Sequence, residues 1–173
     1  MSGIAGVIRC DGQPVEPGQV ETLTAAMHAR GPDGSYYWRH GNVALGLCML
    51  RTTPKSLDET QPLISDDGAL VLVFDGRLDN RDGLIRTLRL NGMPPRLSTD
   101  AELVLGAYRL WGEDSPKHLL GDFAYVVWDS RQQKLFCARD HMGVKPLYYA
   151  ETPAGVVASN TLDCVRLHPA VSE

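Results

Sequence analysis

Residues 123–129 constrain the possible fold more than any other segment, because both faces of the strand that they predict are largely apolar. Side chains alternate between the two faces of a strand, so residues two apart share a face. One face would carry Phe123, Tyr125, Val127 and Asp129, and the other would carry Ala124, Val126 and Trp128. We expect a strand of this kind to be covered on both sides, which places it inside a layered structure.

The order of the other predicted elements indicates the fold class. Short apolar runs predict strands near both ends of the chain, and apolar residues at helical spacing predict helices between them. The expected strands are residues 4–8, 43–50, 69–74, 135–139, 147–150 and 156–159, and the expected helices are residues 18–29, one capped by Asn80 and one capped by Thr99. Hairpin-length connections favour an α+β fold of packed antiparallel sheets, in which residues 123–159 form one meander.

Composition and length limit the classes of protein to which the chain can belong. Its 173 residues, 43% of them hydrophobic, suit a single globular domain, and a net charge of −4 without a basic block argues against nucleic acid or anionic membranes as partners. The sequence has no apolar run of about 18 residues, no secretory signal, no G-x-G-x-x-G or P-loop motif, and no C-x-x-C pair. We therefore expect a cytoplasmic protein with no metal site and no Rossmann fold.

Ser2 is the first candidate for chemistry. Removal of Met1, which a small second residue normally allows, would give Ser2 a free α-amine beside its hydroxyl. An α-amine has an ordinary pKa of about 7.7–8.0, so it can act as the general base for its own side chain. Many proteins begin with Met-Ser for no catalytic reason, so position alone does not decide between these interpretations.

Five short motifs indicate the family of the protein more specifically than Ser2 does alone. They occur in this order: Ser2-Gly3-Ile4-Ala5-Gly6-Val7, Arg30-Gly31-Pro32-Asp33-Gly34, Asp75-Gly76-Arg77-Leu78-Asp79-Asn80, Thr99-Asp100-Ala101-Glu102, and residues 138–149 with the sequence ARDHMGVKPLYY. Together they closely resemble the N-terminal glutaminase domain of asparagine synthetases, a class II glutamine amidotransferase domain. The resemblance extends from residue 2 to about residue 169.

The resemblance implies the N-terminal-nucleophile hydrolase fold, a four-layer α/β/β/α sandwich with two antiparallel sheets. In that family the residue after Met1 is a cysteine, which attacks the side-chain amide of glutamine and releases ammonia to a second, ATP-using domain. The resemblance places the glutaminase-like domain at residues 1–160 and the start of a linker at residues 161–173. ATP and Mg²⁺ are expected only in the synthetase domain, whose S-G-G-x-D-S loop has no match in this sequence.

Two departures from the family pattern concern catalysis. Ser2 stands where the family has cysteine, and a hydroxyl is a poorer nucleophile than a thiol. Asp75 stands where the family has an asparagine that forms the oxyanion hole with the N–H of the next residue, Gly76 here. An ionised carboxylate only accepts hydrogen bonds, so Asp75 would repel a developing oxyanion unless burial kept it protonated.

Two further departures concern recognition of glutamine. Met49 replaces an arginine that holds the α-carboxylate in the family; Arg51 would point to the same face of a strand and is an alternative partner. Arg77 replaces a glutamate that meets the α-ammonium group, which inverts the charge. Asp100 keeps the family's other ammonium-binding residue, although a carboxylate also suits the first turn of a helix.

Four changes in one pocket favour a degenerate glutaminase-like domain that serves as a scaffold for an ATP-dependent synthetase or cyclase domain, fused or separately encoded. Residues 75–82 look most like lasso-peptide cyclases, which with β-lactam synthetases have a disabled glutaminase domain. Two alternatives stay open: an active glutaminase with Ser2 as nucleophile, and a stand-alone ligand-binding module. The sequence does not say whether this domain is itself an enzyme or whether it forms a homodimer.

Overall fold

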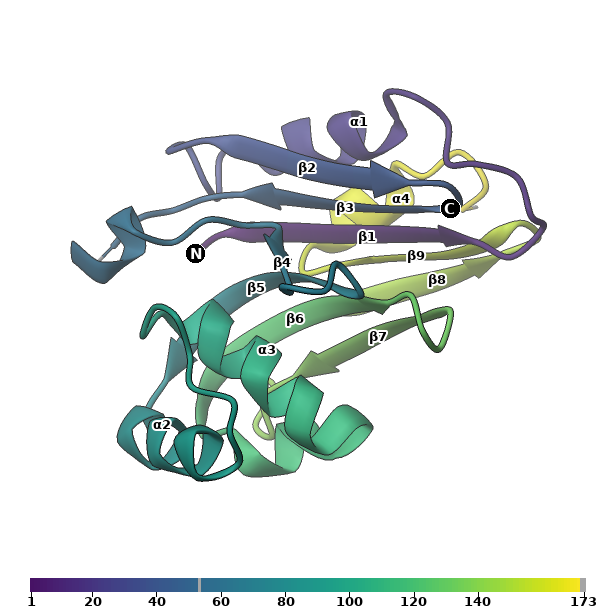
Figure 1. Ribbon diagram of the computed structural model, residues 1–173. Coiled ribbons are helices and arrows are strands. Elements are labelled where there is room, and N and C mark those ends of the chain that lie inside the picture. The colour runs from purple at the N-terminus through teal and green to yellow at the C-terminus, as the bar shows by residue number, and fades with distance from the viewer. Residues whose placement is uncertain (53, 172–173) are drawn as a thin grey trace.

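Two antiparallel sheets form the centre of the molecule in the computed structural model, which describes residues 1–52 and 54–171 (Figure 1). The strands of the first sheet, in spatial order, are β2 (Ser35–His40), β3 (Val43–Cys48), β1 (Gly3–Arg9), β9 (Gly155–Ser159) and β8 (Tyr148–Thr152). The second sheet has the order β4 (Leu63–Ile64), β5 (Leu70–Leu78), β6 (Gly121–Asp129) and β7 (Lys134–Arg139). The first strand of the chain therefore lies in the middle of its sheet, between β3 and β9.

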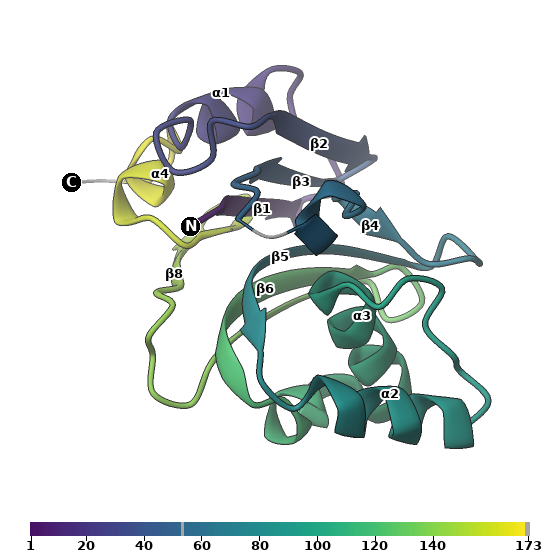
Figure 2. The ribbon, with the colours of Figure 1, turned by 90° about the vertical axis from the view of Figure 1, so that its left-hand side faces the viewer.

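Helices cover the outer face of each sheet, so the fold has four layers (Figure 2). The helices are α1 (Gln19–Ala25) and α4 (Leu162–Arg166) over the first sheet, and α2 (Arg81–Leu90) and α3 (Asp100–Trp111) over the second. Short 3₁₀ helices lie at Pro54–Leu57 and Gly112–His118. The expected α+β sandwich with two antiparallel sheets is confirmed.

Three apolar clusters fill the spaces between the four layers. One lies between the sheets, one between the second sheet and its helices, and one between the first sheet and its helices. Strand β6 contributes to two of them, because Phe123, Tyr125 and Val127 pack toward α3 while Ala124, Val126 and Trp128 pack toward the first sheet. The prediction that this strand is covered on both faces is confirmed.

The single meander expected over residues 123–159 is wrong. Strands β6 and β7 pair with each other in the second sheet, whereas β8 and β9 pair in the first. The segment 140–147 therefore crosses from one sheet to the other. Apolar periodicity predicts that a segment is a strand, but it does not say which sheet the strand joins. The crossing brings Lys145 to Asp75, which also contacts Ser2.

Helix ends differ in part from the expected ones. The first helix ends at Ala25 and is followed by turns, although the sequence predicts a helix to residue 29. Asn80 precedes α2, but its side chain makes no capping bond and instead contacts the backbone of His118 and Leu120. The hydroxyl of Thr99 does accept the N–H of Glu102, as the capping box predicts.

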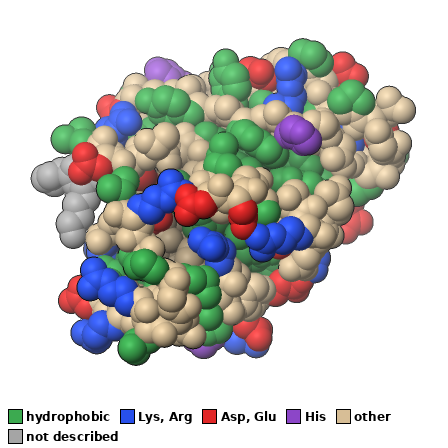
Figure 3. All heavy atoms as spheres, viewed as in Figure 1, with side chains coloured by type: hydrophobic (Ala, Val, Ile, Leu, Met, Phe, Trp, Pro, Cys, Tyr) green, Lys and Arg blue, Asp and Glu red, His purple; other side chains and the backbone are tan. Residues whose placement is uncertain are grey.

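The surface carries charges of both signs side by side. On the face shown in Figure 3, acidic and basic groups are interspersed across the middle of the molecule. Within the residues that the structure describes, no helix is long and apolar enough to cross a lipid bilayer.

Candidate functional site

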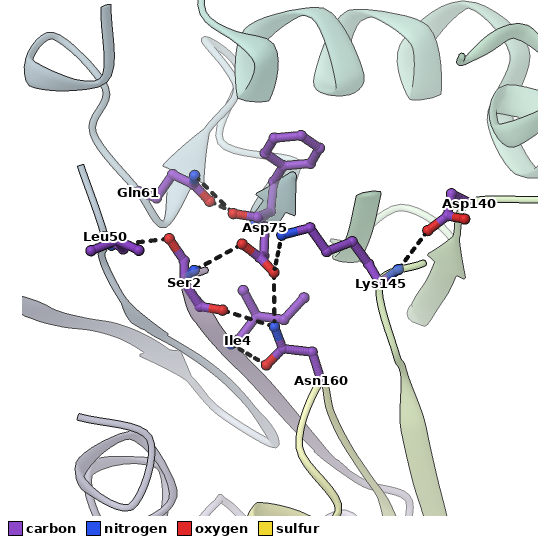
Figure 4. A network of polar contacts seen from close by, with 9 residues as sticks. Ser2, Ile4, Leu50, Gln61, Asp75, Asp140, Lys145 and Asn160 are labelled. Atoms are coloured by element: carbon purple, nitrogen blue, oxygen red, sulfur yellow. Dashed lines mark hydrogen bonds and ion pairs between the residues drawn. The ribbon is translucent and has the colours of Figure 1, made fainter. Parts of the chain in front are cut away.

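Ser2 lies at the start of β1, where the two sheets approach each other. The residue is buried, and its backbone N–H donates to Oδ1 of Asp75 on β5 over 2.8 Å. Its hydroxyl oxygen accepts the backbone N–H of Leu50 over 3.0 Å, and its carbonyl oxygen accepts Nδ2 of Asn160 over 2.9 Å. Three separate segments of the chain therefore fix Ser2 in place (Figure 4).

Asp75 is the centre of this network. Its side chain is 4% exposed, and its second oxygen, Oδ2, accepts Nζ of Lys145 over 3.1 Å and Nδ2 of Asn160 over 3.2 Å. Together with Ser2, three N–H donors therefore surround one carboxylate (Figure 4). This arrangement suits an ionised carboxylate, which accepts hydrogen bonds and donates none.

Lys145 and Asn160 reach Asp75 because their own backbones are held nearby. The N–H of Lys145 donates to Oδ2 of Asp140 over 2.8 Å, in the segment that crosses between the sheets. Asn160 follows β9, is fully buried, and accepts the N–H of Ile4 on its Oδ1 over 2.9 Å. Asn160 thus fastens the start of β1 to the end of β9.

All six residues that the sequence singled out line one cavity of about 280 Å³ at this end of the sheets: Ser2, Met49, Asp75, Gly76, Arg77 and Asp100. Gly76 permits the close approach of β5 to β6, since a Cβ atom there would lie 2.4 Å from the carbonyl oxygen of Asp122. A second cavity, of about 490 Å³, lies between β1, α1 and the C-terminal segment and contains none of the six.

Met49 is part of the core. Its side chain is 3% exposed and packs in the apolar cluster between the sheets. Arg51 points elsewhere: Nη1 donates to the carbonyl oxygen of Asp33 over 3.2 Å, and Nε donates to the carbonyl oxygen of Ser56 over 3.2 Å. The guanidinium of Arg51 is thus held against the 30–34 loop and the 54–57 turn.

The charged residues at the cavity mouth are paired with one another. Arg77 lies 3.1 Å from Asp79 and 3.8 Å from Asp122, with its side chain 69% exposed. Asp100 forms an ion pair with Arg81 and accepts the N–H of Leu78 over 3.1 Å. Its carboxylate is therefore already neutralised by a neighbouring cation.

The surroundings of the cavity shift the pKa of two more groups, the Met1 α-amine and the carboxyl group of Glu59. Burial lowers the pKa of the Met1 α-amine; Asp75 acts in the opposite direction, and the positive charges of Lys145 and Arg30 lower it further. Burial also raises the pKa of Glu59, which lines the cavity. Within the described part of the chain, no group of three or more His, Cys, Asp or Glu residues could hold a metal ion.

Comparison with known proteins identifies the family. A family model described as a glutamine amidotransferase domain matches residues 1–172, which is nearly the whole chain. This chain belongs to the glutamine amidotransferase domain family. Asparagine synthetase [glutamine-hydrolyzing] 3 of Bacillus subtilis is 30% identical to it over 171 residues, and the alignment covers 98% of this chain but 28% of the relative. This chain thus spans less than a third of the length of that relative.

Other relatives agree with this assignment. Amidase chyE of Penicillium rubens is 34% identical over 124 residues, covering 69% of this chain and 18% of that protein. The fold is shared with glutamine phosphoribosylpyrophosphate amidotransferase from B. subtilis, at a TM-score of 0.74 and 18% identity over 94% of this chain and 42% of that one. The expected fold family is therefore confirmed.

Sequence reasoning misses three residues of this amidotransferase site. The motif that contains Lys145 carries the family resemblance but gives Lys145 no role of its own, and no pattern points to Asn160 or Arg81. Lys145 lies in the fifth motif, so that motif contained a signal. Nothing in a single sequence indicates that Asn160 contacts Ser2 across 158 positions.

Proposed function

We propose that this amidotransferase domain does not hydrolyse glutamine and serves as a structural scaffold for an ATP-dependent amide-forming synthetase or cyclase domain. The observation that carries the proposal is the position of Asp75, whose carboxylate is tied to Ser2 and Lys145. The resemblance to asparagine synthetases implies that an oxyanion would form at this place.

The carboxylate of Asp75 opposes that chemistry. A tetrahedral intermediate needs N–H donors aimed at its oxygen, and the loss of one such donor costs about 10²–10³ in rate. Here the donors of Ser2, Lys145 and Asn160 all point at Asp75 instead. An amide attacked by Ser2 would thus develop negative charge beside an existing negative charge.

The substrate-binding groups support the same proposal. A buried thioether at Met49 cannot form the bidentate ion pair that an arginine forms with a carboxylate. Arg51 does not replace it, because its guanidinium is engaged by the carbonyl oxygens of Asp33 and Ser56. Arg77 would repel an α-ammonium group, and Arg81 neutralises Asp100.

A scaffold role fits the contacts of the former catalytic centre. Asp75 joins β5 of the second sheet to Ser2 of the first sheet and to Lys145 of the crossing segment. Asn160 adds the end of β9. The polar network would therefore hold the two sheets in register at this end, and a partner domain would meet a rigid surface.

The partner is inferred from relatives and from resemblance. The matched asparagine synthetase is more than three times as long as the aligned region, so most of its length lies outside the match. We assign ATP and Mg²⁺ to the synthetase or cyclase domain. Residues 75–82 resemble lasso-peptide cyclases. In those enzymes, as in β-lactam synthetases, an amine within the substrate closes a ring and no ammonia is needed.

Ammonia release from glutamine tests the proposal. The purified chain should release no more ammonia than its Ser2→Ala variant, and a variant with Ser2→Cys, Met49→Arg, Asp75→Asn and Arg77→Glu should release more than either, provided that circular dichroism shows it folded. Turnover by the unmodified chain that Ser2→Ala abolishes would refute the proposal and support the alternative of an active Ser2 glutaminase. A cyclase role predicts ATP-dependent ring closure by the partner domain only when this chain is present.

A further inference from the structure

Ser2 and Lys145 share a single buried carboxylate. The nitrogen of Ser2 lies 2.8 Å from Oδ1 of Asp75, and Nζ of Lys145 lies 3.1 Å from Oδ2. The side chain of Lys145 is 11% exposed and that of Asp75 is 4% exposed, so water screens this contact little. A positive charge on the Ser2 nitrogen would compete with the Lys145 ammonium group for the carboxylate of Asp75.

Removal of Met1 would create that competition. Ser2 would then carry an amine, whose ordinary pKa of about 7.7–8.0 lies well below the value of about 10.4 for a lysine. A protonated Ser2 amine would share that carboxylate with the Lys145 ammonium, and Ser2 holds its proton less tightly because its ordinary pKa is lower. Ser2 is the weaker base.

The other charges near the N-terminus favour the same result. Arg30, in the turn after α1, acts on the N-terminal amine in the same direction as Lys145, whereas Asp75 opposes both. The other acidic groups of the cavity are largely occupied: Asp100 pairs with Arg81, Asp122 pairs with Arg77, and burial raises the pKa of Glu59. The one remaining anion, Asp75, is already paired with Lys145, and both Lys145 and Arg30 disfavour a further positive charge at Ser2.

We propose that Lys145, acting through Asp75, keeps the α-amine of Ser2 unprotonated at neutral pH once Met1 is removed. Lys145 is then a positioning residue for the N-terminal base, because it holds the counter-charge that would otherwise hold the amine's proton. The α-amine that can act as general base for the Ser2 hydroxyl is thus retained in a pocket that, on the proposed function, no longer binds glutamine. This inference goes beyond the proposed function and does not require glutamine turnover.

Trace acetylation across a pH series measures the proposal directly, because acetic anhydride reacts only with a neutral amine. The chain is prepared with Ser2 at its N-terminus by cleavage of a fusion, labelled from pH 5 to pH 10, and analysed by mass spectrometry of the N-terminal peptide. We expect a midpoint below the ordinary range of about 7.7–8.0.

Variants give the expected directions. Lys145→Gln should raise the midpoint by roughly one pH unit, which lowers labelling at pH 7 up to about tenfold. Asp75→Asn should give a midpoint below that of the unmodified chain. Lys145→Arg keeps the charge and should keep the midpoint of the unmodified chain. Lys134→Gln, which removes an exposed lysine paired with Glu113, is the matched control and should change nothing.

A midpoint at or above the ordinary range, or an unchanged midpoint in folded Lys145→Gln, would overturn the inference. If Lys145→Gln does not fold, Arg30→Gln removes the second cation and must also raise the midpoint. Ammonia release is measured separately on the same preparations. Glutamine turnover would overturn the proposed function alone, and an unshifted midpoint would overturn this inference alone.

Discussion

The backbone N–H of Ser2 donates to Oδ1 of Asp75 across the two sheets, over 2.8 Å and 73 positions of sequence. The same carboxylate accepts the ammonium group of Lys145. The residue in the nucleophile position therefore faces a carboxylate that is paired with a lysine and that offers no hydrogen-bond donor. This relationship determines both the chemistry that we propose is lost and the stability of the cluster.

Breaking the Asp75–Lys145 pair from one side should be costly. Asp75→Asn leaves a buried ammonium group without a counter-charge, so we expect the free energy of unfolding to fall by about 3–5 kcal/mol, measured by urea denaturation at pH 7. The double variant Asp75→Asn with Lys145→Met should lose less than the two single losses added together. Lys134→Met, which breaks an exposed pair, should cost about 1 kcal/mol or less. A single Asp75→Asn variant as stable as that control would contradict the prediction.

Asn160→Asp should destabilise the fold in a pH-dependent way. The change removes the amide N–H groups that reach Ser2 and Asp75 and puts a second carboxylate beside Asp75. Like charge and burial raise the folded-state pKa of the new carboxyl above its unfolded value of about 3.9. The variant is therefore relatively most stable below about pH 4, and it loses stability as the pH rises through the folded pKa. Urea denaturation of both proteins from pH 3 to pH 8 measures this, and a pH-independent difference would refute it.

Asp140 should make the crossing segment sensitive to acid. Burial by itself raises the pKa of Asp140, but the backbone N–H groups of Lys145, Val144 and Met142 donate to the carboxylate and lower the pKa overall. A lowered folded-state pKa gives stability that is present above the unfolded pKa of about 3.9 and is lost as the pH falls through the folded value.

Asp140→Asn tests this acid sensitivity. We expect the variant to lose about 1–3 kcal/mol of unfolding free energy at pH 7, and its stability to vary less than that of the unmodified chain below about pH 4. Urea denaturation at pH 3, 5 and 7 measures both effects. Equal acid sensitivity in the two proteins would show that Asp140 is not the responsible group.

Two glycines should respond to alanine in opposite directions. A Cβ atom at Gly76 would lie 2.4 Å from the backbone oxygen of Asp122, and two paired strands cannot separate locally without losing hydrogen bonds. We expect Gly76→Ala to lower the unfolding free energy by about 1–3 kcal/mol or more. Gly83 in α2 faces open space, so Gly83→Ala should raise it by about 0.5–1 kcal/mol. Thermal unfolding measures both, and a stabilised Gly76→Ala variant would contradict the close approach of β5 to β6.

Much of the fold could be predicted because the spacing of apolar residues along the sequence indicates which side chains are buried. Strand β6 carries apolar residues on both faces, and that pattern correctly indicated a layer on each side. Strand β2 was missed because most of its side chains are exposed and its pairing depends on β3. The exchange of sheets after β7 was missed because a connection eight residues long fits either a hairpin or a crossing.

The candidate site could be predicted only as far as the motifs reached. The six residues taken from the motifs and their departures all line one cavity. The partners of Asp75 could not be predicted in the same way, because Lys145 and Asn160 are 70 and 85 positions away from it. Contacts of this length depend on the topology of both sheets, which local patterns do not determine.

The central position of β1 has a consequence for the order of events during protein synthesis. Its neighbour β9 and the side chain of Asn160 are made late, because Asn160 follows Ser2 by 158 residues. At about 5–20 residues per second, roughly ten to thirty seconds pass on the ribosome before that neighbour exists. Throughout this interval β1 lacks one of its two neighbouring strands, so the contacts that fix Ser2 are completed only after the chain has been made through Asn160.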